Sequence, residues 1–113
     1  MVMDPDKALL VACKSGDIKL ARKALKNGAT NRNQAMVKAS QFGHINIVEL
    51  MLNNGVTDID LSLFNASASG HLHIVQLLLE RGADKLDEAV KYAAQHDHMN
   101  IVRLLQSHGA GNR

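Results

Sequence analysis

Six histidines and one cysteine are the residues of this chain whose chemistry could support a metal centre or catalysis. His44, His71 and His98 recur at an interval of 27 residues, which is typical either of a ladder of ligands or of a repeated structural contact. Neighbouring repeats of a stacked helical array lie about one helix diameter apart, roughly 10 Å. Zinc binds imidazole nitrogens at about 2.0–2.1 Å, so equivalent histidines would be too far apart to share an ion. His96 stands near His98, but no carboxylate or thiolate cluster completes a site. We expect no metal site and no cofactor.

Cys13 is the only cysteine, which excludes an intramolecular disulfide and a cysteine metal cluster. A reactive thiol needs a neighbouring base or cation and access to solvent. Lys14 is adjacent, but Cys13 falls in a column of small residues that serves packing, which favours a buried, inert thiol. Asp97 beside His98 has the composition of a catalytic pair, yet no nucleophile and no phosphate-binding glycine loop accompany it. We therefore predict no catalytic residue and no enzyme activity.

A repeat that runs through the whole chain positions these residues. The segment 43–55 returns 27 residues later as 70–82 and again as 97–109, and a looser copy covers 16–28. Self-similarity at a fixed period of 20–50 residues is the signature of a stacked repeat protein. After a leader, residues 1–5, the chain divides into four repeats, 6–32, 33–59, 60–86 and 87–113, which we expect to form a single domain.

Each repeat predicts two helices joined by a tight turn. The first helix opens with a residue that we interpret as an N-cap, namely Asp6, Asn33, Asp60 or Asp87. Small residues in register along this helix would let neighbouring helices approach closely, as in the column Ala12, Ala39, Ala66 and Ala93. The break that follows falls at Gly16, Gly43, Gly70 and Asp97.

The second helix of each repeat carries apolar pairs at helical spacing. Ile47 and Val48 are followed one turn later by Met51 and Leu52, which makes one wide apolar face of a helix. A strand would need alternation of period two, which these pairs contradict. A glycine ends each second helix, as expected for a left-handed C-terminal cap, at Gly28, Gly55, Gly82 and Gly109.

The pattern Gly-His-x-x-Ile-Val-x-x-Leu-Leu-x-x-Gly-Ala at 70–83, with near copies at 43–56 and 97–110, closely resembles the ankyrin repeat. The resemblance covers residues 6–113 and implies an all-α, right-handed α-solenoid of four stacked helix–turn–helix repeats. It also implies that the recurring histidine bonds backbone across the repeat boundary. Ankyrin units have about 33 residues and a Thr-Pro-Leu-His opening, which is not retained here. The missing residues correspond to the projecting β-hairpin, and loops this short cannot form two paired strands. We expect little or no β-structure.

The resemblance further implies a non-catalytic protein–protein interaction module that binds a partner protein through its concave first-helix face. Three columns of the first helix vary in chemistry, whereas the core columns are uniform, and mixed surfaces on regular scaffolds are typical of recognition. The predicted partner-binding residues are Lys14, Lys38, Gln41, Phe42, Asn65, Ser69, Tyr92 and Gln95. An alternative interpretation is that Phe42 and Tyr92 only cover neighbouring helices.

Charge is concentrated in the first repeat. Seven basic residues and two acidic ones, Asp6 and Asp17, give that repeat a net charge of +5, whereas the net charge of the whole chain is +2. The excess fits either a solvated cap or an electropositive end that steers an acidic partner. Two alternative functions follow from the pattern. One is a regulatory protein whose basic N-terminal repeat contacts an acidic partner or nucleic acid, and the other is a structural repeat array in a larger assembly.

Composition limits the remaining classes of protein. Hydrophobic residues make up 46% and charged residues 21%, a globular balance that argues against disorder. No apolar run approaches the length of a membrane span, and no signal peptide is visible. We therefore expect a monomeric, cytoplasmic protein that binds a protein partner. We expect it neither to associate with a membrane nor to bind nucleic acid. More polar first and last repeats, seen at Lys23 and Gln106, predict that the array is complete.

Overall fold

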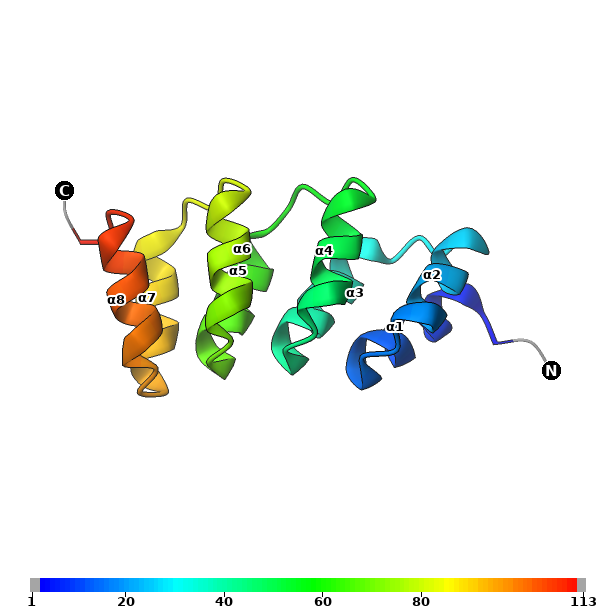
Figure 1. The fold of residues 1–113 in the computed structure, drawn as a ribbon, viewed down its shortest axis with the longest axis horizontal. Helices are drawn as coiled ribbons and strands as arrows, with labels where there is room; N and C mark the ends of the chain where they lie inside the picture. The colour runs from blue at the N-terminus through cyan, green and yellow to red at the C-terminus, as the bar shows by residue number, and fades with distance from the viewer. Residues whose placement is uncertain (1–2, 112–113) are drawn as a thin grey trace. The chain divides into compact units, whose positions relative to one another are not determined.

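The computed structural model describes residues 3–111, and within this range the chain forms eight α-helices and no strand (Figure 1). Their bounds are α1 Pro5–Ser15, α2 Ile18–Lys26, α3 Arg32–Phe42, α4 Ile45–Asn53, α5 Asp60–Ser69, α6 Leu72–Glu80, α7 Leu86–Gln95 and α8 Met99–Ser107. The prediction of four helix pairs joined by short loops without β-hairpins is confirmed for these residues. Residues 1–2 of the predicted leader and 112–113 of the fourth predicted repeat lie outside the described range.

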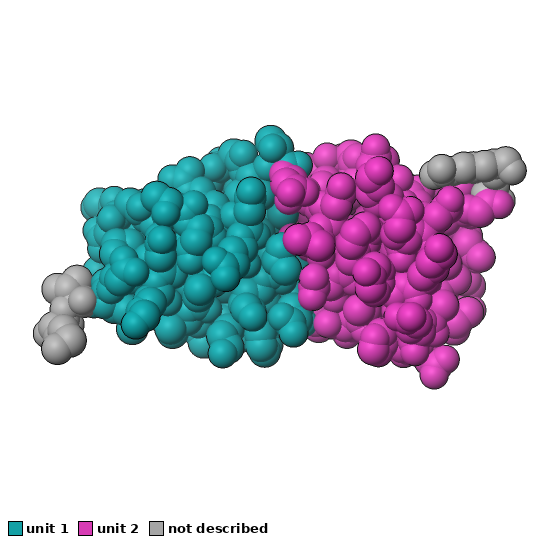
Figure 2. Space-filling model, turned by 180° about the vertical axis from the view of Figure 1, so that it is seen from behind, with its two compact units in different colours: residues 1–57 teal, residues 58–113 magenta. Residues whose placement is uncertain are grey.

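The chain divides into two compact units, Met1–Thr57 and Asp58–Arg113, which Figure 2 shows in different colours. In unit 1, α1 packs against α2 and α3, and α4 packs against α3 and α2. Unit 2 has the same arrangement, with α5 against α6 and α7, and α8 against α7 and α6. Each unit is therefore two stacked helix pairs. The single domain over residues 1–113 stays a prediction.

Small residues let the first helices of each unit pack side by side. The alanines of this interface are almost completely buried: Ala8, Ala12, Ala35 and Ala39 in unit 1, and Ala66, Ala89 and Ala93 in unit 2. The second helices supply larger aliphatic side chains, of which Ile47, Met51 and Leu78 are fully buried. First helices with small buried residues and second helices with aliphatic ones together give each unit a core, while one side of every first helix remains open.

Glycine ends the helices as the sequence predicts. The first helices α1, α3 and α5 end at left-handed glycines, Gly16, Gly43 and Gly70, and the glycines after the second helices also have positive φ. In the fourth repeat Asp97 takes this position with a φ of 59°, a conformation that aspartate tolerates better than most residues with a side chain.

The prediction that Asp6, Asn33, Asp60 and Asp87 are N-caps is wrong. The helices start at Pro5, Arg32, Asp60 and Leu86, so these four residues lie inside the first turn. Two of the acidic side chains, those of Asp6 and Asp87, bond the loop at the end of the same repeat instead. An Asp6 carboxylate oxygen accepts a hydrogen bond from the backbone N–H of Thr30 at 2.8 Å, and an Asp87 oxygen accepts one from that of Gly111 at 3.0 Å. These contacts tie each loop back to the start of its repeat.

None of the described helices could span a membrane. The longest, α1 and α3, have 11 residues each, and no described helix is both long and apolar enough to cross a bilayer.

A buried serine provides a first test of the packing. Ser62 is completely buried and its hydroxyl has no hydrogen-bond partner among the described residues, whereas the equivalent positions hold Ala8, Ala35 and Ala89. Ser62→Ala should raise the free energy of unfolding by about 1 kcal/mol, because a buried polar group without a partner costs about 1–3 kcal/mol. Urea denaturation measures the change. The matched control Ser69→Ala, exposed on α5, corrects for helix propensity, and an equal effect in both variants would contradict the explanation.

Candidate functional site

The first-helix face of unit 1 contains four of the predicted binding residues. Lys14, Gln41 and Phe42 are exposed, and Lys38 is half-buried. The structure brings two of them together, since Lys14 and Lys38 both line a hollow of about 420 Å³. We call it the basic hollow, and its lining residues are Met3, Lys7, Leu10, Val11, Lys14, Gln34 and Lys38. Gln41 and Phe42 do not line it, and Phe42 lies at the end of α3 with 44% of its surface exposed.

The basic hollow combines an apolar lining with three positive charges. Leu10 and Val11 contribute apolar surface, and Val11 is 44% exposed. No acidic residue lines the hollow, and none of its lysines forms an ion pair with a described residue. Lys7 and Gln34 were not among the predicted binding residues. Their spacing is the signal that could have found them, because Lys7 lies seven residues before Lys14 and Gln34 four before Lys38, on the same helix faces.

Unit 2 has a smaller hollow on the same face of its first helices. Asn65 and Tyr92 line it together with Leu61, Phe64 and Ala68, around a volume of about 110 Å³. The rings of Phe64 and Tyr92 are stacked with their centroids 5.2 Å apart, yet Tyr92 remains 42% exposed. Tyr92 therefore covers α5 and also presents surface to solvent. The other predicted residues of unit 2, Ser69 and Gln95, are exposed and do not line this hollow.

The recurring histidines make structural contacts. The Nε2 atom of His44 lies 3.1 Å from the carbonyl oxygen of Lys14, and that of His98 lies 3.1 Å from the carbonyl oxygen of Ala68. A carbonyl only accepts hydrogen bonds, so Nε2 must carry the proton in both. The bond across the repeat boundary that the resemblance implied is confirmed for these two histidines. In the described part of the chain, no group of three His, Cys, Asp or Glu side chains could hold a metal ion.

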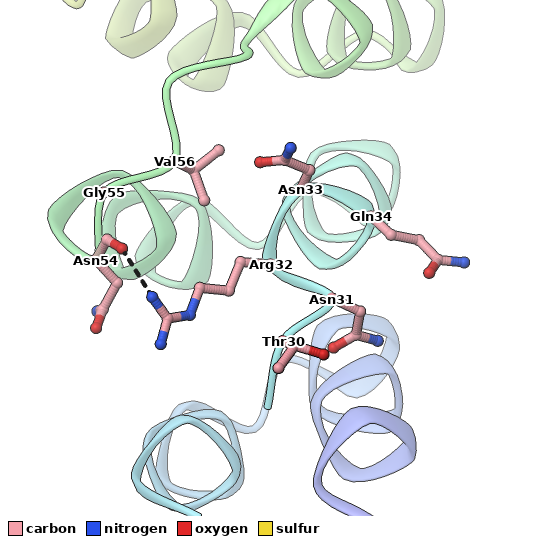
Figure 3. A pocket seen from close by; sticks show the side chains of 8 residues that line it. All are labelled: Thr30, Asn31, Arg32, Asn33, Gln34, Asn54, Gly55 and Val56. Atoms are coloured by element: carbon pink, nitrogen blue, oxygen red, sulfur yellow. Dashed lines mark hydrogen bonds between the residues drawn. The ribbon is translucent and has the colours of Figure 1, made fainter. Parts of the chain in front are cut away.

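A polar hollow of about 430 Å³ lies at the loop end of unit 1, where α3 begins and α4 ends (Figure 3). Arg32 donates a hydrogen bond from Nη1 to the carbonyl oxygen of Asn54, the C-cap of α4, at 3.3 Å. A cation is favourable at a helix C-terminus, so this contact accounts for an arginine where later repeats bury Ile59 and Leu86. None of the predicted binding residues lines this hollow, and the Gln34 side chain points away from Arg32 (Figure 3).

Cys13 is a fully buried free thiol, as predicted, and burial raises its pKa from 9.0 to about 11. The folded state therefore favours the neutral thiol. The resulting stabilisation is present below pH 9 and is lost as the pH rises towards 11. Midway between these values, the wild type should have lost about 1 kcal/mol more of its unfolding free energy than Cys13→Ala. Chemical denaturation of both proteins across this range measures the difference, and parallel curves would contradict the role of the thiol.

Part of the chain matches a known family of repeats. Residues 63–106 match the family model described as ankyrin repeats (many copies), and no curated protein matches the chain. The matched segment begins within α5 and ends within α8, so it covers most of both helix pairs of unit 2. Unit 1 has the same order of helices, left-handed glycines and a histidine contact of the same length. Ankyrin repeats are generally non-catalytic modules for protein–protein interaction. The match thus identifies residues 63–106 as similar to ankyrin repeats, and the stacked helix pairs of each unit are consistent with an ankyrin-like helical repeat fold.

Proposed function

We propose that this protein is a non-catalytic interaction module that binds a partner protein through the first-helix face of each unit, the open side of α1 and α3 in unit 1 and of α5 and α7 in unit 2. One observation carries the proposal. Each of the four first helices presents one large apolar side chain to solvent, and these are Val11, Phe42, Leu61 and Tyr92, each at least 42% exposed. Single exposed apolar residues are ordinary on protein surfaces. The presence of one such residue on the first helix of every repeat supports a binding surface.

The polar residues among the predicted set complete this surface. Lys14, Lys38, Gln41, Asn65, Ser69 and Gln95 all belong to the first helices, and all are exposed or half-buried. Apolar anchors with polar neighbours that satisfy a partner's hydrogen bonds are the usual composition of a protein interface. The proposal includes a monomeric chain that works as one domain. It also includes a cytoplasmic setting, where the lone thiol of Cys13 would remain reduced.

Partner capture with two matched variants tests the proposed function. The face variant carries Val11→Ser, Phe42→Ser and Leu61→Ser. The control variant carries Ile45→Ser and Met99→Ser, which remove similarly exposed apolar side chains from the second helices α4 and α8. Proteins retained by the wild type and the control but lost from the face variant support the assignment, provided that all three unfold at similar temperatures. Retention of the same proteins by the face variant would refute it.

A further inference from the structure

We propose that the basic hollow of unit 1 binds an acidic segment of a partner protein, in which a large apolar side chain enters the hollow between carboxylates. The inference rests on the proposed function and names the chemistry of the partner at one place on the face. It depends on the coincidence of positive charge and apolar surface around a single depression, which occurs at this place on α1 and α3.

The positive charges set where carboxylates would lie. Lys7 and Lys14 are seven residues apart on α1, a separation of about 10 Å along the helix axis, and Lys38 approaches from α3. No acidic residue lines the hollow, so its lining carries three positive charges and no negative one. Such a cluster attracts negative charge and speeds encounter with an acidic partner.

The apolar lining sets what must lie between the carboxylates. Leu10 and Val11 fall between Lys7 and Lys14 in the chain and line the same hollow. Its volume of about 420 Å³ can receive a large aliphatic or aromatic side chain. A helical partner segment would match this arrangement with two acidic residues seven positions apart and an apolar residue three or four positions after the first. The acidic residues would pair with the lysines while the apolar one is removed from water.

The same lining argues against nucleic acid as the occupant. Proteins that bind single strands combine positive charge with aromatic or arginine side chains on which bases stack. The basic hollow has lysines but neither aromatic residues nor arginine. Lysine alone would attract phosphate, but a phosphate backbone would make no favourable apolar contact with Leu10 and Val11. An acidic protein segment uses both parts of the lining.

Selection from a library of random displayed peptides tests the proposal. The hollow variant carries Lys7→Gln, Lys14→Gln and Lys38→Gln. The matched control carries Lys19→Gln, Lys23→Gln and Lys26→Gln, which removes the same charge from exposed positions of α2. We expect the wild type to select peptides with Asp or Glu around a large apolar residue. These peptides should bind the control normally and the hollow variant at least tenfold more weakly. Val11→Ser should also weaken them, since it removes apolar lining.

Several results would overturn the proposal. The wild type could select no peptide at all, or select peptides that are not enriched in Asp or Glu. The selected peptides could also bind the hollow variant and the control equally well. A single-stranded DNA oligonucleotide that binds more tightly than the peptides and is lost with the hollow variant would replace a protein partner by nucleic acid. Different results would contradict the proposed function. Non-acidic peptides lost with Phe42→Ser or Leu61→Ser would leave it standing, whereas peptides insensitive to every first-helix substitution would contradict it as well.

Discussion

Gly70→Ala is expected to lower the free energy of unfolding by about 2–3 kcal/mol, from two separate effects. Gly70 has a φ of +85°, and a left-handed conformation costs a residue with a side chain about 1–2 kcal/mol. A Cβ atom added there would also lie 2.6 Å from Cε1 of His98. The ring must move, which endangers its 3.1 Å hydrogen bond to Ala68, worth about 0.5–1.5 kcal/mol.

Gly82→Ala is the matched control for this prediction. Gly82 has a φ of +95°, but an added Cβ would meet nothing within 4 Å, so only the conformational cost of about 1–2 kcal/mol applies. Urea denaturation of Gly70→Ala, His98→Ala and the double variant then isolates the contact. In the His98→Ala background, Gly70→Ala should cost no more than Gly82→Ala. Equal destabilisation by Gly70→Ala and Gly82→Ala in the wild type would show that the histidine contact is unimportant.

Phe42→Ala should weaken binding of the partner at least tenfold, about 1.4 kcal/mol, while the fold survives. Phe42 is the last residue of α3 and is 44% exposed, so its truncation leaves no enclosed cavity in the core. Large side chains at the centre of an interface can contribute 2 kcal/mol or more to binding. The equivalent positions hold Ser15, Ser69 and His96, so the stacking of repeats does not require an aromatic residue there.

Binding and thermal unfolding should be measured on the same Phe42→Ala preparation, by titration calorimetry with the captured partner and by circular dichroism. Ile45→Ala is the control, because Ile45 is 40% exposed but begins the second helix α4. It should leave affinity unchanged. A Phe42→Ala protein that unfolds, or that binds as tightly as the wild type, shows that Phe42 does not belong to the binding surface.

The architecture of each repeat can be predicted from the sequence alone. The 27-residue period located the eight helices of the described residues, and the glycines at positions such as Gly43 and Gly70 marked where the first helices end. The histidine pattern led to the contacts of His44 and His98 through the ankyrin resemblance. These features are predictable because they depend on short stretches of chain. Helical periodicity and a left-handed turn follow from local backbone energetics, and a repeat presents the same local signal several times.

Contacts between residues far apart in the chain could not be predicted in this way, because they depend on how the helices pack. Asp6 has the residue type of an N-cap, but Thr30, 24 residues away, supplies the backbone N–H that its carboxylate binds. Lys7 and Gln34 join Lys14 and Lys38 around one hollow because α1 packs beside α3. Residue type and spacing show which side chains share a helix face, but the depth of a hollow depends on how two helices pack. That packing is a property of both helices together, which is why the basic hollow emerged only from the folded chain.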